Sequence, residues 1–386
     1  MSAKADVVSH RQMVDSLKAA LPRLYARARL ESAENEAVRD LLRDIEKAIP
    51  AMQKDPERPG VMVTSRDKTS SMLQTFLAQR SQEAGKVEPG VARALEAKFD
   101  SNDGCFGSFF TWWKKIRPHP WIAGISTPEP FPDVARIALL GDWGTGLYGA
   151  PHCAQSIQND KSGYYMVMHL GDVYYSGDDG EMKTRFLDVW PNVQGALSRG
   201  LNGNHEMYTG GKAYFDVALN HFRQPTSYFA LQNNHWLLAC LDTAYADHDL
   251  AGDQASWLTN LIAQAGDRKV VLFSHHQPFS LMDVQGPKVV QKLQVHLTAG
   301  RIYAWYWGHE HHCVIYDPHP VWGLRGRCVG HSGFPEFRKT DWGAAPAQPT
   351  WHRLNQTSDS PGGGLFSTAG TSTSRDTKLN TCPTGT

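Results

Sequence analysis

The sequence of 386 residues predicts a mixed α/β protein in which a helical region precedes the α/β part. Apolar residues recur at helical spacing in the first third of the chain, whereas short apolar strands alternate with helical stretches from Arg136 onward. Most of these strands end directly in Gly, Asp, Asn, Ser or His. Polar residues at strand ends are typical of a layered α/β domain whose functional site lies at one edge of its sheets.

Residues 1–125 are predicted to form a helical N-terminal region or cap. Apolar residues recur at helical spacing in the stretches 13–25, 38–49, 71–84 and 91–99. Pro50 is expected to end the second of these helices, and residues 109–116 fit either a helix or an aromatic loop. The region carries no cluster of Asp, Asn and His at strand ends, so we expect it to shape substrate access or to stabilise the rest of the chain.

The α/β domain is predicted for residues 135–340, after a proline-rich linker at 126–134. Strands are expected at 136–140, 165–170, 227–231, 235–241, 269–273 and 302–307, and helices at 254–265 and 287–297. Asn233-Asn234 is expected to join two of these strands in a hairpin. Residues 341–386 are rich in Ser, Thr and Gly, which predicts a low-complexity, disordered tail.

Composition argues against several classes of protein. Lys and Arg together number 39, as do Asp and Glu, so the chain lacks the basic excess of a general nucleic-acid binder. No apolar run approaches the roughly 20 residues of a membrane helix, and polar residues interrupt positions 1–18, where a signal peptide would be apolar. The six cysteines lack paired spacing. We therefore expect a cytoplasmic protein with reduced thiols.

Five short motifs close apolar strands of the α/β domain. They are Gly141-Asp142-Trp143-Gly144, Gly171-Asp172-Val173-Tyr174-Tyr175, Gly203-Asn204-His205-Glu206, Ser274-His275-His276 and Gly308-His309-Glu310-His311. Each motif alone is weak, because Gly-Asp is common in turns and a single buried histidine is often structural. Together they predict a metal site, because carboxylates, an amide oxygen and imidazoles suit hard to borderline cations.

These motifs resemble those of the calcineurin-like metallophosphoesterases over about residues 135–338. Gly144 stands where most of that family has histidine, and Tyr175 follows Asp172 by three positions. The purple acid phosphatase branch combines the same two features. The resemblance implies a four-layer αββα metallophosphoesterase sandwich that holds two metal ions at its strand ends.

The resemblance also implies which residues bind each of the two metal ions. The first metal would be held by Asp142, Asp172, Tyr175 and His311, and the second by Asp172, Asn204, His275 and His309. A phenolate ligand favours Fe(III) at the Tyr175 site, with Fe, Zn or Mn at the second site. A shift of one position would exchange the roles of His275 and His276, so this alternative stays open.

The implied activity is the hydrolysis of phosphate esters by a metal-activated water, as in a phosphatase or phosphodiesterase with an acid phosphatase-like centre. Asp172 and His205 are the predicted catalytic residues, and His205 would protonate the leaving group or orient the phosphate. Glu206 would either fix the imidazole tautomer or stabilise its loop. The alternative function is a non-catalytic protein-interaction module on the same scaffold. The expected partner is a phosphate-ester substrate, without nucleic acid or membrane.

Overall fold

The computed structural model describes most of the α/β region and parts of the chain on either side. The described residues are 15, 18–19, 21–22, 24–25, 34–53, 67–84, 109, 112–146, 149–280, 286–311, 313–333, 352–354, 365–369 and 380–381. The helix predicted at 91–99 lies outside these residues. Among the described helices, none combines the length and the apolar character needed to cross a lipid bilayer.

The chain divides into two compact units. One combines residues 1–118 with 174–176 and 208–210, and the other contains the remaining residues up to Thr386. In the first unit, helix α2 (Glu34–Gln53) contacts helix α3 (Lys68–Ala84). The apolar side chains that α2 buries recur every three or four residues, so they share one helix face: Leu41, Leu42, Ile45, Ala48 and Ile49.

The structure corrects one prediction for the first unit and refines another. Pro50 does not end its helix but lies inside the last turn of α2, which continues to Gln53. A proline there removes one backbone hydrogen bond, and the helix continues for only three residues after it. Residues 112–115 are helical, and Trp112 packs with Phe76. The aromatic segment thus contains a short helix.

The second unit contains two β-sheets in the described part of the chain. The larger sheet has the strand order β1 (Glu129–Pro130), β5 (Phe229–Gln232), β6 (Trp236–Cys240), β7 (Lys269–Ser274), β8 (Ile302–Trp307), β10 (Arg325–Val329), β9 (Cys313–Pro318) and β11 (His352–Leu354). The smaller sheet has the order β13 (Asn380–Thr381), β12 (Leu365–Ala369), β2 (Ala135–Leu140), β3 (Met166–His169) and β4 (Leu197–Gly200).

Parallel pairing dominates the centre of both sheets. Strands β2, β3 and β4 are mutually parallel in the smaller sheet, and β6, β7, β8 and β10 are parallel in the larger sheet. Strands β5 and β6 form the predicted antiparallel hairpin around Asn233-Asn234. Strands β11, β12 and β13 fall within 341–386. The other residues of that range lie outside the described part, and the domain boundaries stay a prediction.

Helical segments accompany the two sheets. They are α6 (Gly149–Asn159), α7 (Asp179–Glu181), the π-helix η1 (Met182–Phe186), the 3-10 helix η2 (Leu187–Val189), α8 (Asn204–Met207), the π-helix η3 (Tyr214–Ala218), α9 (Leu219–Phe222), α10 (Gln254–Gln264) and α11 (Pro287–Thr298). Helices α10 and α11 coincide closely with the two helices predicted for this region.

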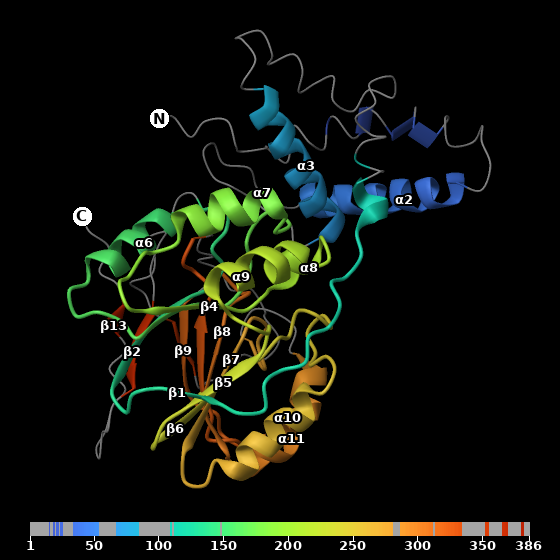
Figure 1. Ribbon diagram of the computed structural model, residues 1–386. Helices are drawn as coiled ribbons and strands as arrows, with labels where there is room; N and C mark the ends of the chain where they lie inside the picture. Colours follow the sequence, from blue (N-terminus) through green and yellow to red (C-terminus); the bar gives the residue numbers. More distant parts are fainter. Residues whose placement is uncertain are drawn as a thin grey trace. The chain divides into compact units, whose positions relative to one another are not determined.

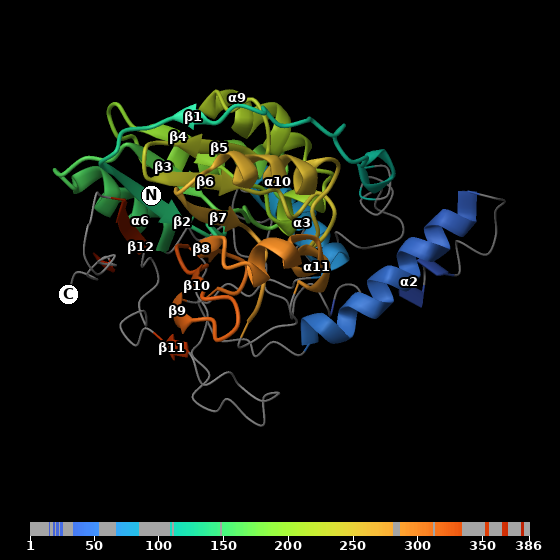
Figure 2. The same ribbon diagram turned by 90° about the horizontal axis from the view of Figure 1, so that it is seen from below.

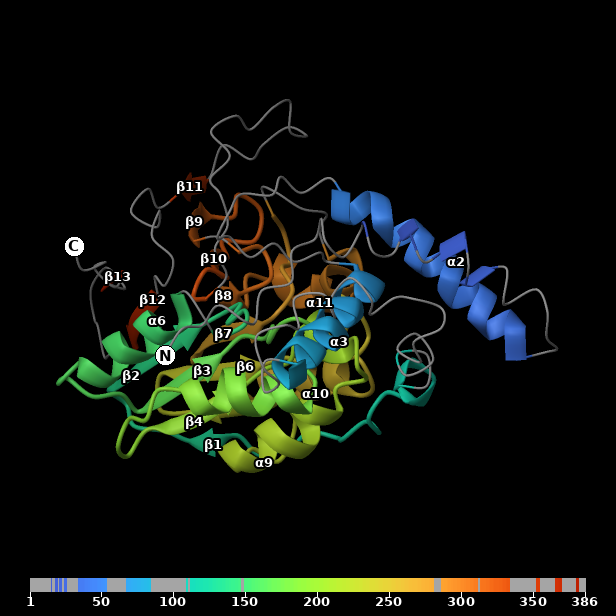
Figure 3. The same cartoon turned by 90° about the horizontal axis from the view of Figure 1, so that it is seen from above.

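Three apolar clusters separate four layers of secondary structure. One lies between α6, α9 and the smaller sheet, a second between the two sheets, and a third between the larger sheet and α10 and α11. Figure 1 shows these helices on opposite sides of the strands. Seen from below, α10 and α11 come to the front (Figure 2), whereas α6 does so from above (Figure 3). This is the predicted αββα sandwich.

An ion pair beside the smaller sheet provides a test of its stability. Asp160 accepts hydrogen bonds from Arg136 Nη2 at 2.8 Å and from the Tyr164 hydroxyl at 2.6 Å. The Arg136 bond, followed by the Tyr164 bond, lowers the pKa of Asp160. A lowered carboxyl pKa stabilises the folded state above the ordinary aspartate pKa of about 4, and this contribution is lost as the pH falls below it.

We therefore expect Asp160→Asn to lower the free energy of unfolding by about 1 kcal/mol at pH 7, since the pair is partly exposed. Urea unfolding between pH 3 and 7 measures this difference. The gap between wild type and variant should narrow toward pH 3. A gap that is constant with pH would contradict the role of the charged carboxylate.

Candidate metal centre

The ends of parallel strands bring the predicted ligands to one edge of the sandwich. From the smaller sheet, Asp142 follows β2, Asp172 follows β3 and Asn204 follows β4; from the larger sheet, His275 follows β7, and His309 and His311 follow β8. All six side chains are buried. Carboxyl ends of parallel strands share an edge, so ligands far apart in the sequence meet there.

Two groups of these side chains have the spacing of metal ligands. One consists of Asp142, Asp172 and His311, and the other of Asp172, His275 and His309. Within each group the ligand atoms lie within 4.8 Å of one another. Asp172 belongs to both groups, which is the position of a carboxylate that bridges two cations. Carboxylate and imidazole donors fit hard to borderline metal ions, so the residues present suit the metals that the resemblance implies.

The imidazole of His275, rather than that of His276, faces the shared carboxylate. Its Nε2 lies 3.1 Å from Asn204 Oδ1, 3.2 Å from His309 Nδ1 and 3.3 Å from Asp172 Oδ1. Its Nδ1 lies 2.8 Å from the carbonyl oxygen of Leu170. A ring that donates from Nδ1 to this carbonyl presents the Nε2 lone pair to the centre, as a metal-binding histidine requires.

Four of the predicted ligands have a left-handed backbone conformation. The φ angles are 57° at Asp142, 75° at Asp172, 68° at His309 and 56° at His311. Such conformations cost roughly 1 kcal/mol or more in a residue other than glycine, and they persist where the surrounding structure enforces them. Here the surrounding hydrogen bonds include one from His309 N–H to Asp142 Oδ2, at 2.8 Å. Hydrogen bonds of this kind hold the loops in shapes that bring the four side chains together.

Glycines beside the ligands let the loops approach one another. A Cβ atom at Gly308 would stand 2.7 Å from Asp142 Oδ2, and one at Gly203 would collide with Asp172 Oδ1. At each of the two glycines, the Cβ atom would stand closer to the carboxylate oxygen than a carbon–oxygen van der Waals contact allows. The Gly-His and Gly-Asn pairs of the motifs therefore serve to bring backbone against a ligand carboxylate.

The centre has a negative electrostatic character. Burial alone would lower the pKa of His275, but the charge of Asp172 and its hydrogen bond raise that pKa to about 9. Burial acts to raise the pKa of Asp172, yet the charges of His275 and His205 outweigh it, and that pKa is lowered. A field that stabilises an imidazolium ion also attracts a metal cation.

His205 lies next to the shared carboxylate. Its backbone N–H donates to Asp172 Oδ1 at 3.1 Å, and its side-chain Nε2 lies 3.9 Å from Asp172 Oδ2. The side chain is almost fully buried. The structure thus brings His205 to the centre without including it in either ligand group.

Glu206 fastens two ligand loops to each other. Its carboxylate accepts backbone N–H bonds from Asp172 at 3.2 Å, Val173 at 2.6 Å and Gly203 at 2.6 Å. Burial, followed by the charge of Asp172, raises the pKa of Glu206 to about 7. Of the two roles that the sequence left open, these bonds correspond to the stabilisation of the loop.

We expect Glu206→Gln to lower the free energy of unfolding by about 2–3 kcal/mol, because an amide cannot accept all three bonds and leaves a buried N–H without a partner. Denaturant unfolding of the metal-free protein measures this loss. Asp267→Asn is the matched control, since it removes one exposed carboxylate. Equal stabilities of the two variants would contradict the fastening role.

Gly144 and Tyr175 are the residues that carry the resemblance to purple acid phosphatases. Gly144 has a φ of 68° and forms a bridge with Val173, in the loop that follows β3. Glycine adopts a positive φ without steric cost, so the backbone conformation alone accounts for a glycine at this position. Tyr175 belongs to the first compact unit and is fully buried. Its role as a metal ligand stays a prediction.

Sequence reasoning missed the loop between β6 and α10. Asp242 and Thr243 follow β6 as polar residues, just as the five motifs follow their strands, and this pattern could have identified the loop from the sequence. Backbone N–H groups of Ala244 and Tyr245 donate to Asp242 Oδ1 at 3.1 and 3.0 Å. These bonds shape a loop that leads to His248, whose ring centroid lies 5.3 Å from that of His309.

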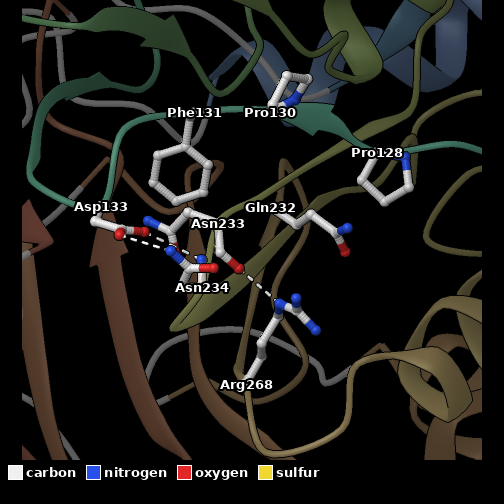
Figure 4. Close-up of a pocket in the computed structure, with 8 residues that line it drawn as sticks. All are labelled: Pro128, Pro130, Phe131, Asp133, Gln232, Asn233, Asn234 and Arg268. Carbon is white, nitrogen blue, oxygen red and sulfur yellow. Dashed lines mark hydrogen bonds between the residues drawn. The ribbon is translucent and has the colours of Figure 1, made fainter.

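A pocket of about 400 Å³ lies elsewhere, beside the β5–β6 hairpin. It is lined by Pro128, Pro130, Phe131, Asp133, Gln232, Asn233, Asn234 and Arg268, as Figure 4 shows. The hairpin precedes β6, so the pocket is at the opposite end of this strand from Asp242. None of the predicted ligands lines it.

Comparison with known proteins agrees with this geometry. Residues 135–313 match the family model described as calcineurin-like phosphoesterase. This part of the chain is a calcineurin-like phosphoesterase domain. Membership of that family supports hydrolysis of phosphoesters in general.

All five motifs, and with them the six buried ligands named above, fall within residues 135–313 of this phosphoesterase domain. A comparison with curated protein sequences gave no match.

Several solved structures are similar to the chain at low sequence identity. The purple acid phosphatase PPD1 from yellow lupin (Lupinus luteus) is 14% identical with a TM-score of 0.48, over 62% of this chain and 51% of the lupin chain. GAP50, the anchor in the inner membrane complex of Plasmodium, is 12% identical with a TM-score of 0.47, over 61% of this chain and 81% of GAP50. A dimetal phosphatase from Danio rerio is 11% identical with a TM-score of 0.39, over 65% of this chain and 99% of that protein. The match thus spans about half the length of the lupin protein.

Proposed function

We propose that the phosphoesterase domain hydrolyses phosphate esters at a centre of two metal ions. The observation that carries this proposal is the sharing of Asp172 between two ligand groups, one with Asp142 and His311 and the other with His275 and His309. Two cations at such a centre would bind phosphate oxygens, activate a water molecule and stabilise the in-line transition state. A non-catalytic scaffold would not need both groups to be complete.

The protein's own side chains have separate roles in this proposal. Asp172 holds both halves of the centre together, and Asn204 contributes a neutral oxygen that limits the total negative charge. His205 is close enough to Asp172 to reach a phosphate bound at the centre, and its Nε2 would deliver a proton to the leaving-group oxygen. Glu206 keeps the loops of Asp172 and Gly203 at a fixed separation.

Chelation tests the proposal directly. Purified protein should hydrolyse 4-nitrophenyl phosphate or its bis(4-nitrophenyl) diester, lose this activity when its metals are removed, and recover it when they are restored. Asp172→Asn should be inactive under all three conditions, whereas Asp133→Asn, an exchange at the distant pocket, should behave like the wild type. Activity that survives complete metal removal would refute the proposal. The ratio of monoester to diester turnover assigns the substrate class.

An acid phosphatase-like centre with Fe(III) in the first site, and Fe, Zn or Mn in the second, is the finer part of the proposal. It is supported by the combination of Gly144 with Tyr175. A cytoplasmic location is part of the same proposal, and it is supported by cysteines that lack the paired spacing of a disulfide scaffold.

The iron assignment predicts a coloured protein. A phenolate bound to Fe(III) absorbs visible light, so Tyr175→Phe should remove the visible band of iron-loaded protein while Tyr174→Phe retains it. Optical spectra and elemental analysis of the two variants measure this. A colourless wild type that carries two zinc or manganese ions would exclude iron and leave the hydrolase proposal intact.

A further inference from the structure

A third group of histidines lies beside the proposed centre. It consists of His248, His276 and His309, whose ligand atoms lie within 4.8 Å of one another. The ring centroids are 3.8 Å apart for His248 and His276, and 4.7 Å apart for His276 and His309. Neither His248 nor His276 has a function in the proposed two-metal centre, so their convergence requires a separate explanation.

His276 presents a nitrogen without a partner. Its side chain is 2% exposed, and its Nδ1 lies 3.0 Å from Thr243 Oγ1. Its backbone N–H donates to the same oxygen at 3.1 Å. Among the residues that the structure describes, the Nε2 atom of His276 has no hydrogen-bond partner. Leaving a buried polar atom unpaired is costly, and a metal ion would satisfy it.

His248 is oriented in a similar way. Its Nδ1 lies 2.8 Å from Asp247 Oδ1, and its backbone N–H donates to the carbonyl oxygen of Thr243 at 2.9 Å. A carboxylate at one imidazole nitrogen fixes the ring and increases the basicity of the other nitrogen, as it does around metal-binding histidines. Thr243 thus holds the backbone of His248 through its carbonyl and the imidazole of His276 through its hydroxyl.

His309 belongs to this group and to the second ligand group of the proposed centre, so it would hold both ions as a bridging imidazolate, with its ring proton lost to solvent. Its Nδ1 lies 3.2 Å from His275 Nε2. Ligand nitrogens of a tetrahedral zinc ion stand roughly 3.3 Å apart, so small side-chain movements suffice to close the present spacing. An all-imidazole set suits Zn²⁺, Cu²⁺ or Ni²⁺ and does not suit Mg²⁺ or Ca²⁺.

We propose that His248, His276 and His309 form a third metal site, for a borderline transition-metal ion such as Zn²⁺. Three protein ligands leave one coordination position open. The side chain of His248 is 35% exposed, so an ion can reach the site from solvent. The site goes beyond the proposed hydrolysis, because its ligands His248 and His276 do not belong to the two-metal centre.

Metal stoichiometry tests the third site. Wild type and His248→Ala are each equilibrated with excess Zn²⁺, freed of loosely held ion, and analysed for zinc per chain. We expect His248→Ala to bind one equivalent less than the wild type and His235→Ala, an exposed histidine at the opposite end of β6, to bind as much as the wild type. Equal stoichiometry in wild type and His248→Ala would overturn the proposal.

The difference between the variants is informative even if the two-metal centre is not formed. In that case the wild type would bind one equivalent and His248→Ala none, and the hydrolase proposal alone would fail. Asp247→Asn provides a second test that leaves all three ligands in place. Its affinity for the last zinc equivalent should be roughly 10–100-fold lower than that of the wild type. An unchanged affinity would contradict the arrangement around His248.

Discussion

Asn204→Ala is expected to release one of the two metal ions and to lower hydrolysis by about 10³-fold. The Asn204 amide oxygen lies 3.1 Å from His275 Nε2, among the donors of the second ligand group, and alanine has no oxygen to replace it. Loss of one cation removes several kcal/mol of transition-state stabilisation, and each factor of ten in rate corresponds to about 1.4 kcal/mol. Elemental analysis and steady-state kinetics measure both effects.

The matched control is Asn234→Ala, which removes an exposed amide that bonds to Asp133. It should retain both metals and full activity. His309→Ala should match Asn204→Ala in turnover, and it should also lose the ion of the third group, to which His309 belongs. An Asn204→Ala protein that keeps two metals and wild-type rates would show that the amide is not a ligand.

His205→Ala is expected to keep both metals and to lose turnover by about 10²–10⁴-fold on an alkyl phosphate, the usual range for general acid catalysis. Its Nε2 is 3.9 Å from Asp172 Oδ2, so the imidazole adjoins the centre without belonging to a ligand group. An aryl phosphate has a good leaving group that departs without protonation. Its hydrolysis should therefore decline much less.

The comparison of two leaving groups separates proton transfer from a general loss of structure. His235→Ala, which removes an exposed imidazole, should leave both rates unchanged. Equal losses on aryl and alkyl phosphates, or a loss of metal from His205→Ala, would reject the assigned role.

The central strands were predictable because each is a short apolar run that ends in a polar motif. Strands β2, β7 and β8 follow this pattern, and so does the hairpin of β5 and β6. Strands β9 and β10 do not, because Asp317, Arg325 and Arg327 interrupt their apolar residues. Strand β10 pairs with β8, and β9 pairs with β10, through contacts that no local spacing in the sequence reports.

Candidate ligands could be predicted where residues of ligating type stand close together in the sequence, as His309 and His311 do. The functions of Glu206 and Thr243 were not, because each depends on bonds to segments distant in the sequence. Glu206 bonds to Asp172 across 34 positions, and Thr243 bonds to His276 across 33. Which of His275 and His276 faces Asp172 likewise depends on the position of Leu170.

The ligands come from both sheets, and this has a consequence for unfolding. Asp142, Asp172 and Asn204 follow strands of the smaller sheet, whereas His275, His309 and His311 follow strands of the larger one. Cations held among them would act as removable cross-links between the two sheets, and these links would exist only while both sheets are folded together. Binding free energy is thereby added to the free energy of unfolding, so the melting temperature would rise with the concentration of free metal.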